Sequence, residues 1–399
     1  MTATYDLLSP EHFAAPYQTF ALMRENDPLY WHEQMGMWFA TRYRDVHAIS
    51  RDRRFSSARV DSFMPPGTDE KTQAVRWFFT DWMLFSDPPE HTRLRKLVSR
   101  AFVPRSIATL ESFIHRVVDE ALDRVNGQYE IDIIGDFGFP VPSRVIAHML
   151  GVAPDRVHDF EQWSHGVLRV PSLVGDPDEN VTITYRAVRS LEAYFRDLIA
   201  ERRAVPTEDL LGLMVQANED GSMLSEHELM AHCALFLIAG HETTTNLIGN
   251  ATLALLRNPG ELARLRAQPD LAASAVEEFL RYDGAVAGIA RQAKEDVQLS
   301  GGVVPAGAVV MAVLPSANRD PAVFADPDRL DVGRGDTRHL GFGGGPHACI
   351  GAALARMETR IAMTSLLARY PRMELAVSEP SHIVGWTVRG VTSLPVNVG

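Results

Sequence analysis

One ten-residue segment constrains this chain more than any other: residues 342–351, which read FGGGPHACIG. The segment holds Cys349, one of only two cysteines, behind a run of glycines and before apolar residues at helical spacing. Because Cys233 is the only other cysteine, a disulfide scaffold does not explain this placement. The segment therefore predicts a loop that leads into a helix and carries a single thiol at the helix N-terminus.

The predicted surroundings of this thiol suit a metal ligand. The dipole and the free N–H groups of a helix N-terminus stabilise a thiolate, which is the form that binds metals. Glycines before Cys349 would let a flat ligand approach the backbone closely. Apolar side chains would enclose such a ligand: Phe342, Ile350, Leu354, Met357 and Ile361. An iron porphyrin held by one thiolate fits this chemistry, and a buried, inert cysteine is the alternative.

The whole segment resembles the haem-binding loop of the cytochrome P450 family, F-G-x-G-x-H-x-C-x-G, at every defined position. The match continues through residues 352–356, and three further motifs follow the family's order along almost the entire chain. The resemblance implies a mainly α fold with small β-sheets, in which haem b is buried between a long central helix and the helix after the loop. It also implies that Cys349 is the iron ligand and that Phe342, Gly343 and Gly351 contact the haem.

Length and composition favour one domain over residues 1–399, because no linker or repeat divides the chain. The N-terminus shows no signal peptide, and the longest near-apolar stretch, residues 233–240, is far shorter than the about 20 residues that a membrane helix needs. The net charge of −12 argues against nucleic acid as a partner. We therefore expect a cytoplasmic monomer of the bacterial type, without a membrane anchor.

Secondary-structure signals are mainly helical. Ser225 and Glu228 form a capping box, which predicts a helix that runs to Asn258 over roughly 50 Å. The middle of this helix is apolar nearly all round, so we expect it to be buried. Asp87 is predicted to cap another helix, which begins near Pro88. Strand signals are fewer: residues 37–40, 297–299, 309–311 and 394–398.

The long helix contains residues 239–244, AGHETT, which match the family motif A-G-x-E-T-T. Two threonines and an acid are poor choices for stability in a buried helix, although a simple kink could also explain them. The resemblance implies that Thr243 hydrogen-bonds dioxygen at the haem and that Glu242 relays protons. It also implies that Ala239 and Gly240 contact the haem, whereas we expect His241 to pack.

Two further sets of residues follow from the resemblance. One set would bind the haem propionates: His91, Arg95, Arg291 and His347. The other is the E-x-x-R motif, in which Glu278 and Arg281 would form a buried ion pair that braces the cysteine loop. Arg329 or Arg334 would be its third member, and the sequence leaves this choice open.

The pocket is expected to take a hydrophobic small molecule. The side chains that the resemblance places there are apolar, and ordinary core packing is their alternative role: Trp82, Met83, Leu235, Val286 and Ile289. Electrons would come from an external ferredoxin or flavodoxin with an NAD(P)H-dependent reductase. The helix that carries Arg93, Lys96 and Arg100 would be its docking site or else a solvated face.

The activity that this resemblance implies is insertion of one oxygen atom of O2 into a C–H bond. A peroxygenase or a ring-coupling oxidase would use the same scaffold, and a haem sensor would need neither Thr243 nor an apolar pocket. A cysteine hydrolase built on Cys349 and His347 would lack a third residue to orient the pair.

Overall fold

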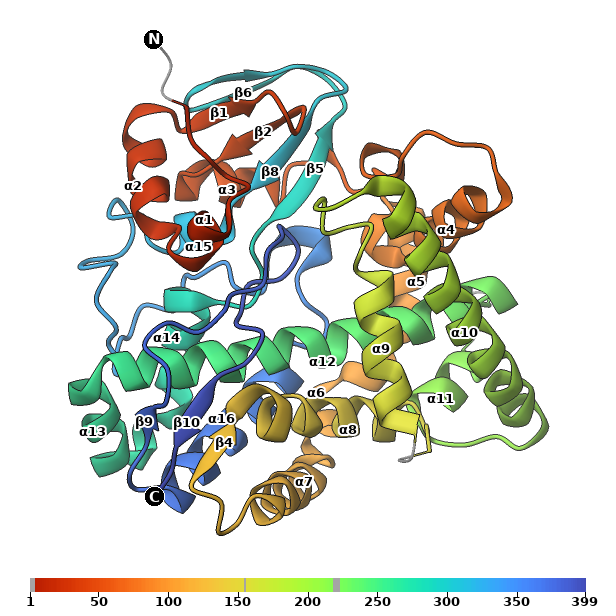
Figure 1. The fold of residues 1–399 in the computed structure, drawn as a ribbon. Coiled ribbons are helices and arrows are strands. Elements are labelled where there is room, and N and C mark those ends of the chain that lie inside the picture. Colours follow the sequence, from red (N-terminus) through yellow and green to blue (C-terminus); the bar gives the residue numbers. More distant parts are fainter. Residues whose placement is uncertain (1–3, 154–155, 218–222) are drawn as a thin grey trace. The chain divides into compact units, whose positions relative to one another are not determined.

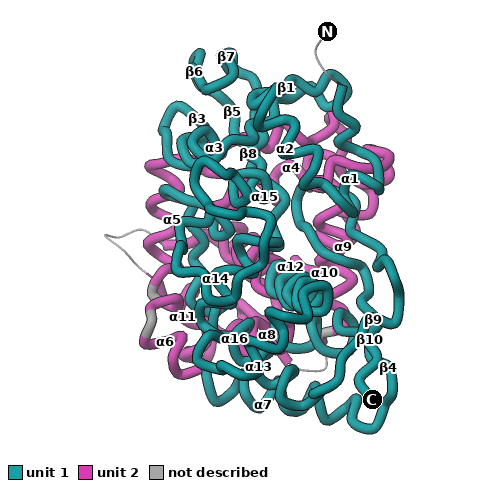
Figure 2. The backbone as a smooth tube through the Cα atoms, turned by 90° about the vertical axis from the view of Figure 1, so that its left-hand side faces the viewer, with its two compact units in different colours: residues 1–55, 111–142, 242–399 teal, residues 56–110, 143–241 magenta. Residues whose placement is uncertain are grey.

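The computed structural model describes residues 4–153, 156–217 and 223–399, and its elements are labelled in Figure 1. The chain forms two compact units (Figure 2). Unit 1 comprises residues 1–55, 111–142 and 242–399, and unit 2 comprises residues 56–110 and 143–241. A single domain over the whole chain stays a prediction. Within the described ranges, no helix combines the length and the apolar character needed to cross a membrane.

Among the described residues, unit 1 contains helices and nearly all of the strand residues. Its helices are α1 (Pro10–Ala14), α2 (Tyr17–Asn26), α3 (Tyr43–Ile49), α7 (Glu111–Arg124), α13 (Pro259–Ala267), α14 (Ala272–Asp283), α15 (Leu314–Ala317) and α16 (Ala352–Arg369). A π-helical turn spans Ile133–Gly138, and a 3-10 turn, η6, spans Pro269–Leu271. The helix α16, which follows the cysteine loop, packs against α7 and α14.

The largest sheet has the strand order β1-β2-β8-β5-β3. Its strands are β1 (Leu29–His32), β2 (Met37–Ala40), β8 (Val309–Ala312), β5 (Ile289–Ala293) and β3 (Phe55–Ser56), which crosses the unit boundary. Strand β2 pairs parallel with β8, and β8 pairs antiparallel with β5, so that Arg291 lies opposite Val310. Apolar side chains of β2, β5 and β8 form a buried core with α3.

Two smaller sheets complete unit 1. One has the order β4-β10-β9, from β4 (Glu130–Asp132), β10 (Pro395–Asn397) and β9 (Glu374–Leu375). The other is the hairpin of β6 (Val297–Leu299) and β7 (Gly302–Val304). All four strand regions expected from the sequence are present as β2, β6, β8 and β10. The prediction of a mainly α fold with small sheets is confirmed.

Unit 2 is built from helices. They are α4 (Glu70–Thr80), α5 (Glu90–Val98), α6 (Pro104–Ala108), α9 (Val157–Val167), α10 (Pro177–Ala204) and α11 (Leu210–Gln216), with 3-10 turns η1 (Val60–Ser62), η2 (Met83–Phe85) and η3 (Ser99–Phe102). The long helix α10 packs against α9, α4 and α11. The helix α8 (Pro140–Met149) crosses from unit 1 into unit 2.

The longest helix is α12 (Glu226–Arg257), which begins in unit 2 and continues into unit 1. Its capping box is formed as expected: the Ser225 N–H donates to Glu228 Oε2 at 2.7 Å, and the Glu228 N–H donates to Ser225 Oγ at 3.2 Å. Asn258 and Pro259 then begin α13, with Pro259 in its first turn. The predicted course of this helix is confirmed at both ends.

The predicted cap of α5 is wrong. This helix begins at Glu90 with Pro89 at the N-cap position, and no side chain caps it. The Asp87 carboxylate instead accepts hydrogen bonds from the Ser56 hydroxyl at 2.7 Å and the Ser57 N–H at 2.8 Å. A contact with residues some 30 positions earlier has therefore taken the place of the local cap.

Candidate functional site

The cysteine loop, residues 342–351, folds back on itself before α16. The Cys349 N–H donates to the Phe342 carbonyl oxygen at 3.0 Å. Gly343 and Gly345 have φ values of +67° and +63°, which side chains rarely allow. The Cys349 side chain is exposed and lies three residues before the first residue of α16. The loop thus presents one accessible thiol close to a helix N-terminus, as the sequence predicted.

The loop rests on an early segment of the chain. A Cβ atom on Gly345 would lie 2.5 Å from the Ser50 carbonyl oxygen and 3.1 Å from Arg51 Cα. Because those atoms belong to the backbone, they cannot rotate away. Glycine is therefore required at position 345 both for its φ angle and for this close approach.

The other cysteine has the opposite environment. Cys233 is fully buried in α12, and burial raises the pKa of its thiol far above the ordinary value. A thiol in such surroundings stays protonated and is a poor metal ligand. Of the two cysteines, Cys349 alone is accessible to a ligand.

An ionic network on α14 and α16 surrounds the loop, and the sequence did not reveal it. The Glu277 carboxylate accepts hydrogen bonds from Arg356 Nε at 2.6 Å and Nη2 at 2.9 Å, and it lies 3.0 Å from His339 Nε2. Half-burial alone would raise the pKa of Glu277, but His339 and Arg356 outweigh it and lower this pKa to about 2. The Arg356 guanidinium also lies over the Phe342 ring, 4.5 Å from its centroid. Arg356 therefore links α14 to the loop.

One face of α12 is accessible in a helix that is otherwise buried. From Leu229 to Leu255 every residue is buried except Ala239, which is exposed, and Gly240 and Thr243, which are half-buried. Ala239 and Gly240 both neighbour Thr243 on the helix surface, because they lie four and three positions before it. Glu242 next to them is buried. The accessible face therefore coincides with the motif found in the sequence.

A side chain one turn further along the helix hydrogen-bonds to the backbone of this motif, a contact that the sequence analysis did not predict. Asn246 Nδ2 donates to the Glu242 carbonyl oxygen at 2.7 Å, so an amide side chain bonds back along the helix. His241 is buried, and its Nδ1 lies 2.7 Å from the Leu237 carbonyl oxygen. This position agrees with the packing role expected for His241.

The cysteine loop fits a haem. Its thiol is single and accessible, and a Cβ atom on Gly351 beside it would meet nothing within 4 Å, which leaves space for a flat ligand. In the part of the chain that the structure describes, no three His, Cys, Asp or Glu side chains are grouped so as to hold a bare metal ion. The donor set suits an iron that brings its own equatorial ligands and takes one thiolate from the protein.

The four residues expected at the propionates are divided between the units. In unit 2, His91 is buried in α5 and Arg95 is half-buried one turn later. In unit 1, Arg291 is buried in β5, where its Nη1 donates to the Ala290 carbonyl oxygen at 2.8 Å, and His347 is half-buried in the cysteine loop. Their joint action on a haem stays a prediction.

The Glu278–Arg281 pair is fully buried, with side chains 1% and 0% exposed. Arg281 Nε and Nη2 donate to the two carboxylate oxygens at 2.7 and 2.8 Å. Arg334 Nε donates to Glu278 Oε2 at 3.1 Å, whereas the Arg329 side chain pairs with Asp331. The third member of the group is therefore Arg334.

The expected substrate residues have packing roles in their own units. In unit 2, Leu235 and Met83 are buried, and the buried Trp82 ring lies 5.1 Å from Phe79 between ring centroids. In unit 1, Val286 and Ile289 are half-buried and pack against the core of the five-stranded sheet. Contact of these five residues with a substrate stays a prediction.

The basic helix that was expected to dock a redox protein carries less uncompensated positive charge than its sequence suggests. Arg93 pairs with both Glu90 and Glu228 in unit 2. Its charge is therefore compensated, which argues against Arg93 as a docking residue. Lys96 is exposed, and the side chain of Arg100 lies outside the described part of the chain.

The sequence model of one protein family, Cytochrome P450, matches residues 30–395. The chain belongs to the cytochrome P450 family. As a P450 it is a monooxygenase with haem iron as its cofactor.

Its relatives are bacterial P450s over nearly their whole length. Cytochrome P450 107B1 of Saccharopolyspora erythraea is 41% identical, over 91% of this chain and 89% of the relative. Vitamin D(3) 25-hydroxylase of Pseudonocardia autotrophica is 38% identical, over 100% and 97%. The crystal structure of P450BioI in complex with an acyl carrier protein that carries hexadec-9Z-enoic acid matches with a TM-score of 0.92 and 34% identity, over 98% and 99% of the two chains.

Proposed function

We propose that this P450 inserts one oxygen atom of O2 into a C–H bond of a hydrophobic small molecule. Haem b would bind at Cys349, and an external ferredoxin or flavodoxin with an NAD(P)H-dependent reductase would supply electrons. The observation that carries the proposal is the accessible thiol of Cys349 at the start of α16. When bound, the haem supplies activation of dioxygen and oxidation of the substrate.

The loop and α16 favour the thiolate form of Cys349. The N-terminal end of α16 offers a partial positive charge, and the Arg356 guanidinium interacts electrostatically with the sulfur. Glu277 and His339 hold Arg356 in place on the Phe342 ring. The role of this network is to stabilise a negative sulfur and to fix the loop that carries it.

The accessible face of α12 supports the proton chemistry. The Thr243 hydroxyl can both donate and accept a hydrogen bond, and it lies on the part of the helix that is not buried. Glu242 is the adjacent acid, and a carboxyl group is suited to carry protons to that hydroxyl. The Thr243 hydroxyl would hold a proton at the reacting oxygen. Glu242 would then supply a new proton to that hydroxyl.

The substrate class is supported by the relatives and by the side chains. One relative is named for hydroxylation of vitamin D(3), and one similar structure holds a C16 fatty acyl group. The residues that we assign to the pocket are apolar: Trp82, Met83, Leu235, Val286 and Ile289. We propose a substrate of similar hydrophobic character. Candidate substrates can be found as hydrophobic compounds that change the optical spectrum of the haem-loaded protein. Those compounds would then be used as substrates in the activity assay.

Alkylation of the haem-free protein tests the proposed ligand. Iodoacetamide should modify Cys349, because it is exposed, and should spare Cys233, because its thiol is buried and protonated. Added hemin should protect Cys349 and produce a coloured protein. Mass spectrometry of the peptides measures both effects.

The matched variants are Cys349→Ser, which should take up no label and form no thiolate-type haem spectrum, and Cys233→Ser, which should behave like the parent chain. Equal labelling of Cys349 with and without hemin would contradict its role as the iron ligand.

Thr243→Ala tests the proton pathway. The variant should keep its haem but divert most electrons into hydrogen peroxide, because the hydroxyl that holds the proton is gone. The measurement is the ratio of oxidised product to NAD(P)H consumed. Thr252→Ala is the control, since the Thr252 hydroxyl is buried in the same helix and bonds only within unit 1, to the Ile248 carbonyl oxygen and Met363. An unchanged ratio in Thr243→Ala would remove Thr243 from the mechanism.

A further inference from the structure

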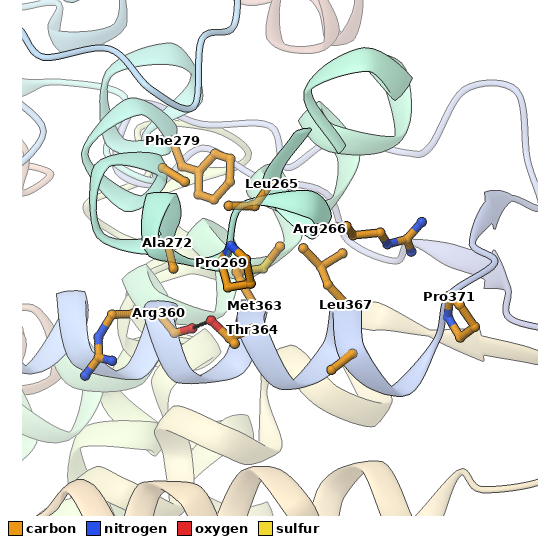
Figure 3. Close-up of a pocket in the computed structure, with 12 residues that line it drawn as sticks. Leu265, Arg266, Pro269, Ala272, Phe279, Arg360, Met363, Thr364, Leu367 and Pro371 are labelled. Carbon is orange, nitrogen blue, oxygen red and sulfur yellow. Dashed lines mark hydrogen bonds between the residues drawn. The ribbon is translucent and has the colours of Figure 1, made fainter. Parts of the chain in front are cut away.

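Unit 1 has a groove that the proposed monooxygenase function does not use. One wall is α16, and the other is formed by the end of α13, η6 and the start of α14, as Figure 3 shows. Its volume is about 250 Å³. None of its lining residues is among those assigned to haem or substrate.

The lining of the groove is mostly apolar. Leu265, Phe279, Met363 and Leu367 are buried and form its deep part. Thr364 is exposed at the rim, and its hydroxyl donates to the Arg360 carbonyl oxygen within α16 at 2.7 Å. The groove thus offers an apolar surface with little competing hydrogen bonding, which is typical of a ligand pocket.

Two arginines line the groove, and among the described residues only one of them has a carboxylate as its counter-ion. The Arg360 guanidinium pairs with Glu111 at 3.0 Å. Arg266 Nη2 donates to the Tyr370 carbonyl oxygen at 2.8 Å, but its Nε is buried and has no hydrogen-bond partner among the described residues. Within those residues no carboxylate pairs with Arg266, and burial lowers its pKa. A half-buried cation without a counter-ion is costly, so an anion placed beside it would be stabilised.

We propose that this groove binds a small amphipathic carboxylate. Its apolar tail would cover Leu265, Phe279 and Met363, and its carboxylate would accept hydrogen bonds from the Arg266 guanidinium. The volume suits a ligand smaller than a typical drug-sized molecule, such as a medium-chain fatty acid. An alcohol or an amine of the same length would leave the Arg266 charge unpaired.

Calorimetric titration of the haem-loaded protein with octanoate tests the proposal, with octan-1-ol and octylamine as probes of the head group. Octanoate should bind saturably. Octanol and octylamine should bind roughly tenfold or more weakly, as expected for loss of a charge-assisted hydrogen bond. Arg266→Gln should weaken octanoate by a similar factor while leaving octanol unchanged.

Thr364→Trp is a second variant, which should fill the groove from an exposed position and, for that reason, should fold like the parent chain. It should weaken octanoate and octanol alike. Arg189→Gln, which removes an exposed arginine of α10 in unit 2, is the control and should bind like the parent chain. Absence of saturable octanoate binding, or equal affinity in the parent chain, Arg266→Gln and Thr364→Trp, would overturn the proposal. Equal affinity in the three chains would mean that octanoate binds at another site, such as the substrate pocket.

Discussion

Glu358 shows at the scale of single residues how the interior sets a protonation state. It lies on α16 with 1% exposure, and burial raises the pKa of its carboxyl group well above the ordinary value. The neighbouring Thr244 on α12 offsets only part of this effect. Glu358 is therefore a neutral acid in the folded protein at pH values where it would be ionised in the unfolded chain.

This state has a consequence for stability. Because the folded chain binds one proton more than the unfolded chain, the free energy of unfolding should fall as the pH rises above the ordinary glutamate pKa of about 4.5. Glu358→Gln keeps the shape of the neutral acid and should remove this contribution, so its gain over the parent chain should grow from pH 5 to pH 8. Urea unfolding at both pH values measures the difference. A constant difference between the two chains would show that Glu358 is ionised when folded.

Single residues also show where sequence reasoning stops. The place of Cys349 before a helix and of Thr243 within the long helix was predictable, because both belong to short contiguous motifs. Arg334 could not be chosen over Arg329, since its partner Glu278 lies 56 positions earlier. Glu277 and His339 were missed for the same reason: their contact depends on how α14 and the loop are folded.

At the scale of elements, one helix cap predicted from local sequence is confirmed and another is wrong, because its side chain binds a distant segment instead. The capping box of α12 formed because its two residues, Ser225 and Glu228, are only three positions apart. The cap expected for α5 failed because Asp87 found Ser56 and Ser57. The local sequence pattern cannot show which polar side chain will hydrogen-bond to a distant segment.

Two Glu–Arg pairs of the same i,i+3 spacing allow a matched test of burial. Glu278→Ala leaves Arg281 and Arg334 without their counter-ion in the interior of unit 1, so it should destabilise by about 3–5 kcal/mol and impair haem retention. Glu192→Ala breaks the partly exposed pair with Arg189 on α10, whose side chains are 18% and 56% exposed, and should cost less than about 1 kcal/mol. Chemical unfolding and the haem content after purification measure both. Similar losses in the two variants would contradict the bracing role of Glu278.

At the scale of the whole molecule, distant parts of the sequence meet within unit 1. The half-buried Asp283 carboxylate accepts hydrogen bonds from the Tyr17 hydroxyl and from Arg389 Nε, both at 2.5 Å, and the Arg319 guanidinium stacks on the Tyr17 ring. Burial alone would raise the pKa of Asp283, but the charge and hydrogen bond of Arg389, with Tyr17 and Arg319, together outweigh burial and lower this pKa. This cluster could not be predicted from the sequence, because its members come from four distant parts of the chain.

The composition of unit 1 bears on how the protein is made. Its residues come from 1–55, 111–142 and 242–399, and Gly345 of the cysteine loop rests on Ser50 and Arg51. On the ribosome, the early segment must wait for the cysteine loop, which is translated some 300 residues later. Residues 56–110 and 143–241 are synthesised sooner and can assemble first. Loading of the cofactor should then follow the packing of the cysteine loop against this early segment.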